Sequence, residues 1–412
     1  MVLATYFDMG SSTCPRLLSH SSSPGLQHII MDSYKEDDAR AGTVEIEDIT
    51  RCKGNRQILR RLKGDDVTFS RVVVLRGHGY NDYYHVVDNH PNSTASDGYY
   101  VPRATDDLGW LGYYISKSSR LKELSVWRDS VTNVQLKAFC RLLAANASLE
   151  RIWFLDRGSR GAFPAEVLPM LTRFFGHNHS LTNVTMWNGC VADLELEALA
   201  PALENMRRLK VLDLSHNTSI TVRGYRSLSA LLRNTDSCLE EVRLSHNNVD
   251  DEVTVVLAEA LTQNQTVKVL SLHGHALTFR GWSPFSKLLC DVSSPDATFL
   301  SNHTLQSIHG GAPDGVRFFL KLNRGPHVAR TKLLAHHPVL DVRPRRAWEY
   351  KLLPLVVGWL ERAAAAPASA EADLDGRKLA TLRRFVRGYP EEYFRTRGGP
   401  WRRKRSRPAG KN

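Results

Sequence analysis

A short apolar motif recurs along the middle of the chain at intervals of 28 to 32 residues. Each copy reads apolar-x-x-apolar-x-apolar. The six clear copies are LKELSVWRDSV (121), LERIWFLDRGS (149), LTNVTMWNGCV (181), LKVLDLSHNTSI (209), LEEVRLSHNNV (239) and VKVLSLHGHAL (267). A degenerate copy begins at residue 69 and a truncated copy at residue 305. Because repeats of this length stack on their neighbours, the periodicity predicts a solenoid.

The apolar positions within each copy predict short strands. Successive residues of a strand point to opposite faces, so the fourth and sixth residues of each copy should be buried together. We expect parallel strands at 124–127, 152–155, 184–187, 212–215, 242–245 and 270–273. The segments between them, such as 222–233 and 251–262, have apolar residues at helical spacing. Thr221 and Asp250 lie where N-caps would be.

The repeat resembles a known consensus. The pattern L-x-x-L-x-L-x-x-N-x-L is that of leucine-rich repeats, and the copy at 239 matches it throughout, with Asn247 in the asparagine position. Asn217 has this position in the copy at 209, and the other copies have Asp129, Arg157, Gly189 or His275. The repeat length resembles the ribonuclease-inhibitor type. This resemblance implies an α/β horseshoe solenoid with parallel strands on its concave side and helices on its convex side.

Blocks outside the motif extend the resemblance. They are ILRRLKGDDVTFSRVVVL (58–75), DDLGWLGYYISKSSRLKELSV (106–126), GWSPFSKLLCDVSSPDATFLSNHTLQSI (281–308) and KLLAHHPVLDVRPRRAWEYKLLPLVVGWLERA (332–363). Together they resemble the uncharacterised diatom leucine-rich-repeat proteins that carry a C-terminal helical module. The resemblance covers roughly residues 45–395. It implies the fold but no molecular role, because that set has no assigned activity.

Composition divides the chain into four parts. We expect a disordered leader at 1–48, although its Ser-rich sequence faintly resembles a transit peptide. The solenoid should occupy 49–311, with an N-terminal cap and an inserted loop at 77–102. A solenoid exposes its core at both ends, so we expect the helical C-terminal module at 312–395 to pack on the last repeat. Residues 396–412 form a basic tail that we expect to be disordered.

Charge is unevenly distributed along the chain. Residues 1–315 carry a net charge of −3 and residues 316–412 a net charge of +15. The tail contains a run without acidic residues, namely Arg402, Arg403, Lys404, Arg405 and Arg407. Such a run is typical of a nuclear import signal, of an arm that binds polyanions or of a solubilising end. The longest apolar run, 352–360, has less than half the length of a membrane span. We therefore expect a cytoplasmic protein, with the nucleus as the alternative location.

Cysteines and N-x-S/T sequons give little evidence of an extracellular protein. The six cysteines are widely spaced, without a C-x-x-C pair, which favours a reducing compartment and no zinc ribbon. Seven sequons begin at Asn92, Asn146, Asn178, Asn183, Asn217, Asn264 and Asn302. In NASL and NHSL the sequon ends a helix just before a strand, so we attribute most of them to the repeat.

Known catalytic motifs are absent from the sequence, including the Walker loop, G-x-S-x-G and H-E-x-x-H. The Ser-His pairs at 215–216 and 245–246 are adjacent residues near strands. Adjacent strand side chains point to opposite sides, which is poor geometry for a nucleophile and its base. His78, His85 and His90 have metal-ligand chemistry, but their spacing is typical of a polar surface loop. We expect no catalytic residue, no metal and no cofactor.

A chelator test follows from this expectation. If the chain folds without a metal, a chelator should leave its melting temperature unchanged, because no ligand bond contributes to folding. Thermal unfolding with and without the chelator measures this. A fall of many degrees would instead point to a metal site at His78, His85 and His90.

Positions five and seven of each copy should project from the concave face. They are Ser125 and Trp127, Trp153 and Leu155, Thr185 and Trp187, Asp213 and Ser215, Arg243 and Ser245, and Ser271 and His273. Tryptophan is enriched at binding hot spots, and exposed apolar clusters mark partner sites. We therefore predict a partner-binding site, with charged residues at its rim, formed by Trp127, Trp153, Leu155, Trp187, Arg128, Arg243 and His273. The alternatives are that the inserted loop folds over the tryptophans, or that they belong to the core.

These features support two functional hypotheses. The first is a non-enzymatic scaffold that binds an unknown protein partner on its concave face. The second is a nucleic-acid-associated or nuclear factor that uses the basic C-terminal quarter to contact nucleic acid or an import receptor.

Overall fold

The computed structural model describes residues 37–38, 40–75, 97–103, 106–157, 161–275 and 277–337. The leader up to residue 36, residues 76–96 of the inserted-loop region, and the chain beyond residue 337 lie outside the described residues. The basic tail and most of the predicted C-terminal module are therefore not covered.

The described strands form one parallel sheet in the order β2-β1-β3-β4-β5-β6-β7-β8-β9. Their bounds are β1 (Arg71–Val74), β2 (Asp97–Tyr100), β3 (Glu123–Trp127), β4 (Arg151–Leu155), β5 (Asn183–Trp187), β6 (Val211–Asp213), β7 (Glu241–Arg243), β8 (Val269–Ser271) and β9 (Ser307–His309). All six predicted strands are confirmed, although β6, β7 and β8 end earlier than expected. In β6 the chain turns after Asp213, whose carboxylate accepts a hydrogen bond from the backbone N–H of Ser215 at 2.9 Å.

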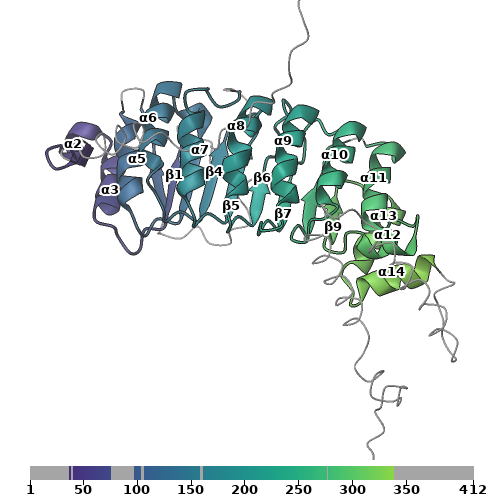
Figure 1. The fold of residues 1–412 in the computed structure, drawn as a ribbon. Coiled ribbons are helices and arrows are strands. Elements are labelled where there is room, and N and C mark those ends of the chain that lie inside the picture. The colour runs from purple at the N-terminus through teal and green to yellow at the C-terminus, as the bar shows by residue number, and fades with distance from the viewer. Residues whose placement is uncertain are drawn as a thin grey trace, which may run out of the picture.

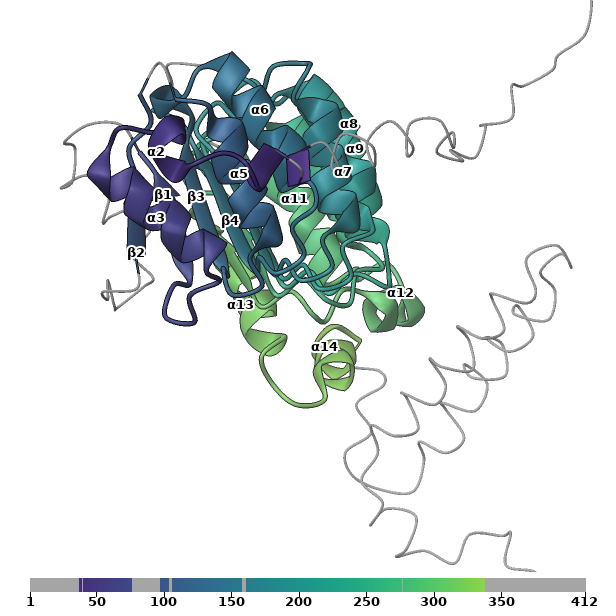
Figure 2. The same cartoon turned by 90° about the vertical axis from the view of Figure 1, so that its left-hand side faces the viewer.

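Helices connect the strands and lie in a layer on one side of the sheet (Figure 1). Figure 2 looks along the stack from the β2 end and shows the same two layers. The bounds are α2 (Ile46–Ile49), α3 (Lys53–Lys63), α5 (Leu108–Lys117), α6 (Asn133–Leu143), α7 (Leu168–His177), α8 (Asp193–Glu204), α9 (Val222–Arg233), α10 (Asp251–Leu261), α11 (Phe279–Leu289), α12 (Pro295–Leu300), α13 (Asp314–Leu322) and α14 (Val328–His336). Thr221 and Asp250 are N-caps of α9 and α10, as predicted. The chain thus folds as an α/β leucine-rich-repeat solenoid.

The core lies between the sheet and the helix layer. The fourth and sixth residues of the six clear copies are buried there, with at most 2% of their surface exposed. They are Leu124, Val126, Ile152, Phe154, Val184, Met186, Leu212, Leu214, Val242, Leu244, Leu270 and Leu272. The predicted register is therefore confirmed.

Leu244 provides a direct test of this packing. Its side chain is fully buried in the core, so Leu244→Ala removes apolar contacts and leaves a cavity. We expect the free energy of unfolding to fall by about 2–5 kcal/mol, measured by denaturant titration. Leu194→Ala is a suitable control, because Leu194 is 63% exposed on α8 and should change stability little. Equal losses in the two variants would contradict the register.

Asparagine side chains stabilise the turns that follow the strands. The Asn217 side-chain amide donates to the carbonyl oxygens of Met186 and Leu214, both at 2.7 Å. The Asn247 amide donates to the carbonyl oxygen of Leu214 at 3.0 Å. In the sixth copy, Nε2 of His275 lies 3.0 Å from a backbone carbonyl oxygen of the preceding copy. These contacts pair backbone groups that the turns would otherwise bury without partners.

A second set of asparagines stabilises the turns between helices and strands. Asn146 accepts hydrogen bonds from the backbone N–H groups of Ser148 and Leu149, both at 3.0 Å, and donates to the carbonyl oxygen of Ile115 in the preceding repeat at 2.8 Å. The same pattern recurs at Asn178, Asn264 and Asn302. All four are buried, which confirms that these sequons belong to the repeat.

The first repeat is extended by a strand within the predicted inserted loop. Residues 97–100 form β2, which pairs with the outer edge of β1. The Asn55 side chain on α3 binds the end of this strand, because it donates to the carbonyl oxygen of Val101 and accepts from its N–H, both at 2.9 Å. Gly98 is required here by space, since a Cβ atom would lie 2.5 Å from the Phe69 ring.

At the other end, α12, α13 and α14 cover the last repeat. Lys332 on α14 is fully buried, and its ammonium donates to the carbonyl oxygens of Leu289 and Asn302. Burial lowers the pKa of Lys332 to about 8. Because these carbonyl groups end α11 and precede β9, the lysine joins α14 to the last repeat.

Candidate partner-binding face

A second apolar cluster lies on the face of the sheet opposite the helices. We call this face the strand face; it is the face that was predicted to be concave. The cluster comprises buried Val73, Leu75, Trp127 and Leu155, and partly buried Tyr99, Trp153 and Trp187. We call these seven residues the strand-face cluster. Trp127 is in register with Leu155 and then with Trp187, while Trp153 lies one column away. The predicted grouping of the three tryptophans and Leu155 is thus present. Sequence reasoning missed Val73, Leu75 and Tyr99, which lie outside the six clear copies.

The expected exposure of this cluster is wrong for two of its members. Trp127 is only 4% exposed and Leu155 is fully buried. The Arg157 guanidinium lies 5.3 Å from the centre of the Trp127 ring and is paired with Asp129 at 3.7 Å. Trp127 and Leu155 are therefore supporting residues, because neighbouring side chains cover them. Trp153 and Trp187 are the cluster's partly exposed indoles.

The prediction that Arg128 lies at the rim of a binding site is wrong. Arg128 lies inside the protein. Its side chain and that of Asp156 are 1% and 0% exposed, and the closest guanidinium and carboxylate atoms are 3.8 Å apart. Arg128 also donates to the carbonyl oxygens of Gly161 and Ala162 at 2.5 and 3.1 Å. The guanidinium lies 4.5 Å from the Phe163 ring. Residues 161–163 therefore cover the guanidinium, and Arg128 has a structural role.

The charged side chains of the strand face pair with one another. Arg243 lies 2.7 Å from Glu241 and 3.5 Å from Asp213. Glu123 pairs with Arg71 at 3.8 Å and also with Arg151. The strand face therefore carries largely compensated charge on both sides of the tryptophans. Two predicted site residues lie on the later, polar strands of this face. Arg243 is half-buried there and His273 is exposed.

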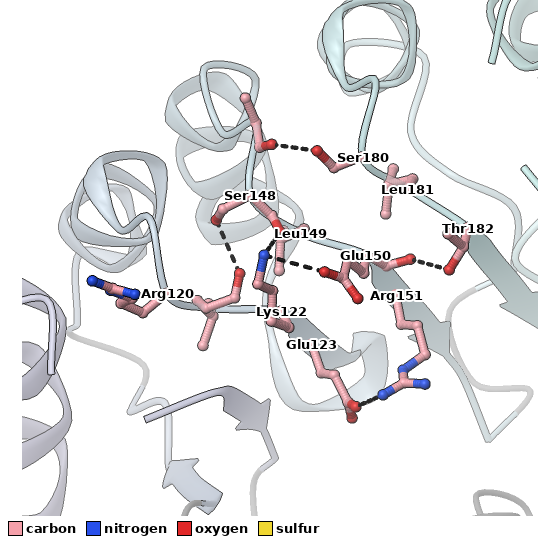
Figure 3. A network of polar contacts seen from close by, with 12 residues as sticks. Arg120, Lys122, Glu123, Ser148, Leu149, Glu150, Arg151, Ser180, Leu181 and Thr182 are labelled. Carbon is pink, nitrogen blue, oxygen red and sulfur yellow. Dashed lines mark hydrogen bonds and ion pairs between the residues drawn. The ribbon is translucent and has the colours of Figure 1, made fainter. Parts of the chain in front are cut away.

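Another network lies at the starts of the strands, away from the cluster (Figure 3). Lys122 pairs with Glu150 at 3.1 Å, and the carbonyl oxygen of Glu150 accepts a hydrogen bond from Thr182 at 3.1 Å. These residues have the second position of successive copies. Residues at the second position of later copies form similar ion pairs, in which Glu240 pairs with Lys210 and with Lys268. Such exposed pairs contribute little stability each. Alternating charge at position two was the sequence signal for this network.

Aromatic rings continue from the cluster along the turns after the strands. The Trp187 and His216 rings have centroids 4.8 Å apart, and the His216 and His246 rings stack at 4.4 Å with an interplanar angle of 21°. Both histidines have the eighth position of their copies. Their rings thus contact neighbouring repeats, and the Ser-His pairs at 215–216 and 245–246 are explained by repetition.

Several predicted site residues lie outside the described residues. They are His78, His85 and His90 of the inserted loop and Arg402, Arg403, Lys404, Arg405 and Arg407 of the tail. In the part of the chain that is described, His, Cys, Asp and Glu side chains form no group of three or more that could hold a metal ion. The described helices also include none with the length and apolar character needed to cross a membrane.

The chain was compared with protein-family models, with curated proteins and with solved structures. No protein-family model matches the chain, and no curated protein matches it. Among solved structures, the chain is similar to one described as the crystal structure of a TLR13–ssRNA13 complex, with 14% sequence identity and a TM-score of 0.22. The match covers 48% of this chain and 33% of that chain, so it spans about a third of the other protein. Such a low score carries no argument, and the fold assignment rests on the strands and the repeat. The ribonuclease-inhibitor type and the likeness to diatom proteins stay predictions.

Proposed function

We propose that this chain is a non-enzymatic scaffold that binds a protein partner on its strand face. The observation that supports this proposal is the pair of partly exposed indoles, Trp153 and Trp187, above the buried members of the strand-face cluster. Tryptophan is frequent among residues that dominate binding energy. A regular sheet holds both indoles in place, so little conformational entropy is lost when a partner binds.

The surroundings of the indoles suit an apolar side chain of the partner. Interfaces commonly combine an apolar centre with a polar rim. Here the ion pairs of Glu123 and Arg151 lie on one side, and those of Asp213 and Arg243 on the other. Arg243 and His273 stay in the proposed site as polar contacts, whereas Trp127, Leu155 and Arg128 support it from within.

Proximity labelling of the full-length chain tests the scaffold proposal. We expect a reproducible set of labelled proteins that is depleted with Trp153→Ala and with Trp187→Ala. Phe279→Ala is the matched control, because Phe279 on α11 is an aromatic residue that is 86% exposed on the helix side. The scaffold proposal fails if both tryptophan variants fold and label the same proteins as the unmodified chain.

The alternative is a nucleic-acid-associated or nuclear factor, and the observation that favours it is the net charge of +15 on residues 316–412. Binding through phosphate contacts weakens steeply with salt. The alternative therefore predicts salt-dependent retention on a nucleic-acid column that disappears when residues 395–412 are deleted. Partner capture that survives this deletion favours the scaffold. A cytoplasmic or nuclear location is part of these proposals, and the labelled proteins would report it.

A further inference from the structure

The aromatic stack beside the strand-face cluster has an unusual backbone. His216 and His246 have φ angles of 63° and 56°, in the left-handed region. Hydrogen bonds between repeats hold this conformation, since the His216 N–H donates to the carbonyl oxygen of Ser245 at 2.8 Å. Because the backbone is fixed, the two imidazole rings are held in contact.

The stack ends at the next repeat, where the eighth position is Gly274. A Cβ atom on Gly274 would lie 2.3 Å from Nδ1 of His246, so the absence of a side chain makes room for the imidazole. The stack therefore runs from Trp187 through His216 to His246, and His246 packs against Gly274. It borders the strand-face cluster through Trp187.

Other titratable groups surround the two imidazoles. Burial and the neighbouring His246 lower the pKa of His216, while Asp213 acts in the opposite direction. Asp213 is itself paired with Arg243. Burial also lowers the pKa of His275, and the neighbouring His246 lowers it further. His216 is half-buried and His246 is exposed, so solvent reaches the stacked pair.

We infer that the Trp187–His216–His246 stack makes the strand face sensitive to acid. This inference rests on the proposed function of that face. At neutral pH the His216 ring beside Trp187 is uncharged, because its pKa lies below the ordinary histidine value. Protonation of His216 places positive charge beside the Trp187 indole and at stacking distance from the His246 ring. An apolar side chain of a partner is then bound less tightly, because it would desolvate a charged group.

Nuclear magnetic resonance of the full-length chain alone tests this inference. The chain is labelled with ¹⁵N-tryptophan, and the Trp187 indole signal is identified by its loss in Trp187→Phe. We expect this signal to shift between pH 7.5 and 5.0 together with the His216 ring signals. The midpoint should lie below the ordinary histidine value of about 6.5.

Two variants separate the stack from a general effect of acid. His216→Asn should abolish the response of the Trp187 signal, and asparagine tolerates the left-handed backbone. His246→Asn should move the His216 midpoint to higher pH, because one neighbouring positive charge is removed. His177→Asn on α7 is the control, since His177 is exposed on the helix side. A Trp187 signal that stays fixed, or that titrates equally in His216→Asn, overturns the inference.

The partner provides a separate readout. A partner found by proximity labelling should bind about tenfold more weakly at pH 5.5 than at pH 7.5, and equally at both values with His216→Asn. Loss of the Trp187 response would refute the acid-sensitive stack while leaving binding at pH 7.5 intact. Absence of any partner at pH 7.5, with a normal Trp187 titration, would refute the proposed function alone.

Discussion

Replacing Arg128 with methionine should lower the free energy of unfolding by about 3–5 kcal/mol. The substitution leaves the Asp156 carboxylate buried without its arginine, and it removes the donors to the carbonyl oxygens of Gly161 and Ala162. A buried charge that loses its partner is costly because water cannot solvate it. Equilibrium unfolding in urea, followed by circular dichroism, measures the loss.

An exposed arginine is the matched control. Arg226 pairs with Glu252 at 3.1 Å, and both side chains are more than 60% exposed. Arg226→Met should therefore change stability by less than about 1 kcal/mol. The double variant Arg128→Met, Asp156→Leu should recover part of the loss, since it also removes the buried carboxylate. If Arg128→Met lowered stability as little as Arg226→Met, Arg128 would not be needed for folding. This result would contradict its structural role.

The core register could be predicted from the sequence because six copies repeat the same physical requirement. In any one copy, an apolar residue at position four could belong to a strand or a helix. Six copies with the same alternation leave one arrangement in which residues such as Leu124 and Leu270 bury the same face of one sheet. The N-cap positions Thr221 and Asp250 followed from the same regularity.

The environment of the strand face could not be predicted in the same way. Alternation tells from which face of a strand a side chain leaves, but not what covers it afterwards. Trp127 leaves from the predicted face and is then covered by Arg157, a residue from the next repeat. Arg128 follows a strand end, where alternation no longer applies, and residues 161–163 cover it.

Contacts that occur in only one or two repeats could not be predicted from the repeat pattern either. Tyr99 joins the strand-face cluster because β2 pairs beyond β1, an order that reverses the chain sequence. The histidine stack needs the left-handed turn at His216 and His246. A signal did exist for the stack, namely histidine at the eighth position of two consecutive copies, followed by glycine in the third.

The tryptophans of the strand face should now differ in their response to substitution. Trp127→Ala should lower the free energy of unfolding by about 3–5 kcal/mol, because the indole is 4% exposed and its loss leaves a cavity. Trp187→Ala should change stability much less, because its ring is only partly buried. We expect it instead to weaken partner binding by about 2 kcal/mol, the scale of a hot-spot residue, which corresponds to roughly a thirtyfold rise in Kd.

Thermal unfolding and a binding titration of the same preparations separate these two roles. Phe279→Ala, on the helix side, should be silent in both measurements. Trp127→Ala should lower the melting temperature, and any loss of binding should follow from the unfolded fraction. If Trp187→Ala unfolds the protein as readily as Trp127→Ala, Trp187 supports the fold like the buried members of the strand-face cluster and contacts no partner. If it folds normally and binds the partner at full affinity, the Trp187 indole is not part of the partner-binding site.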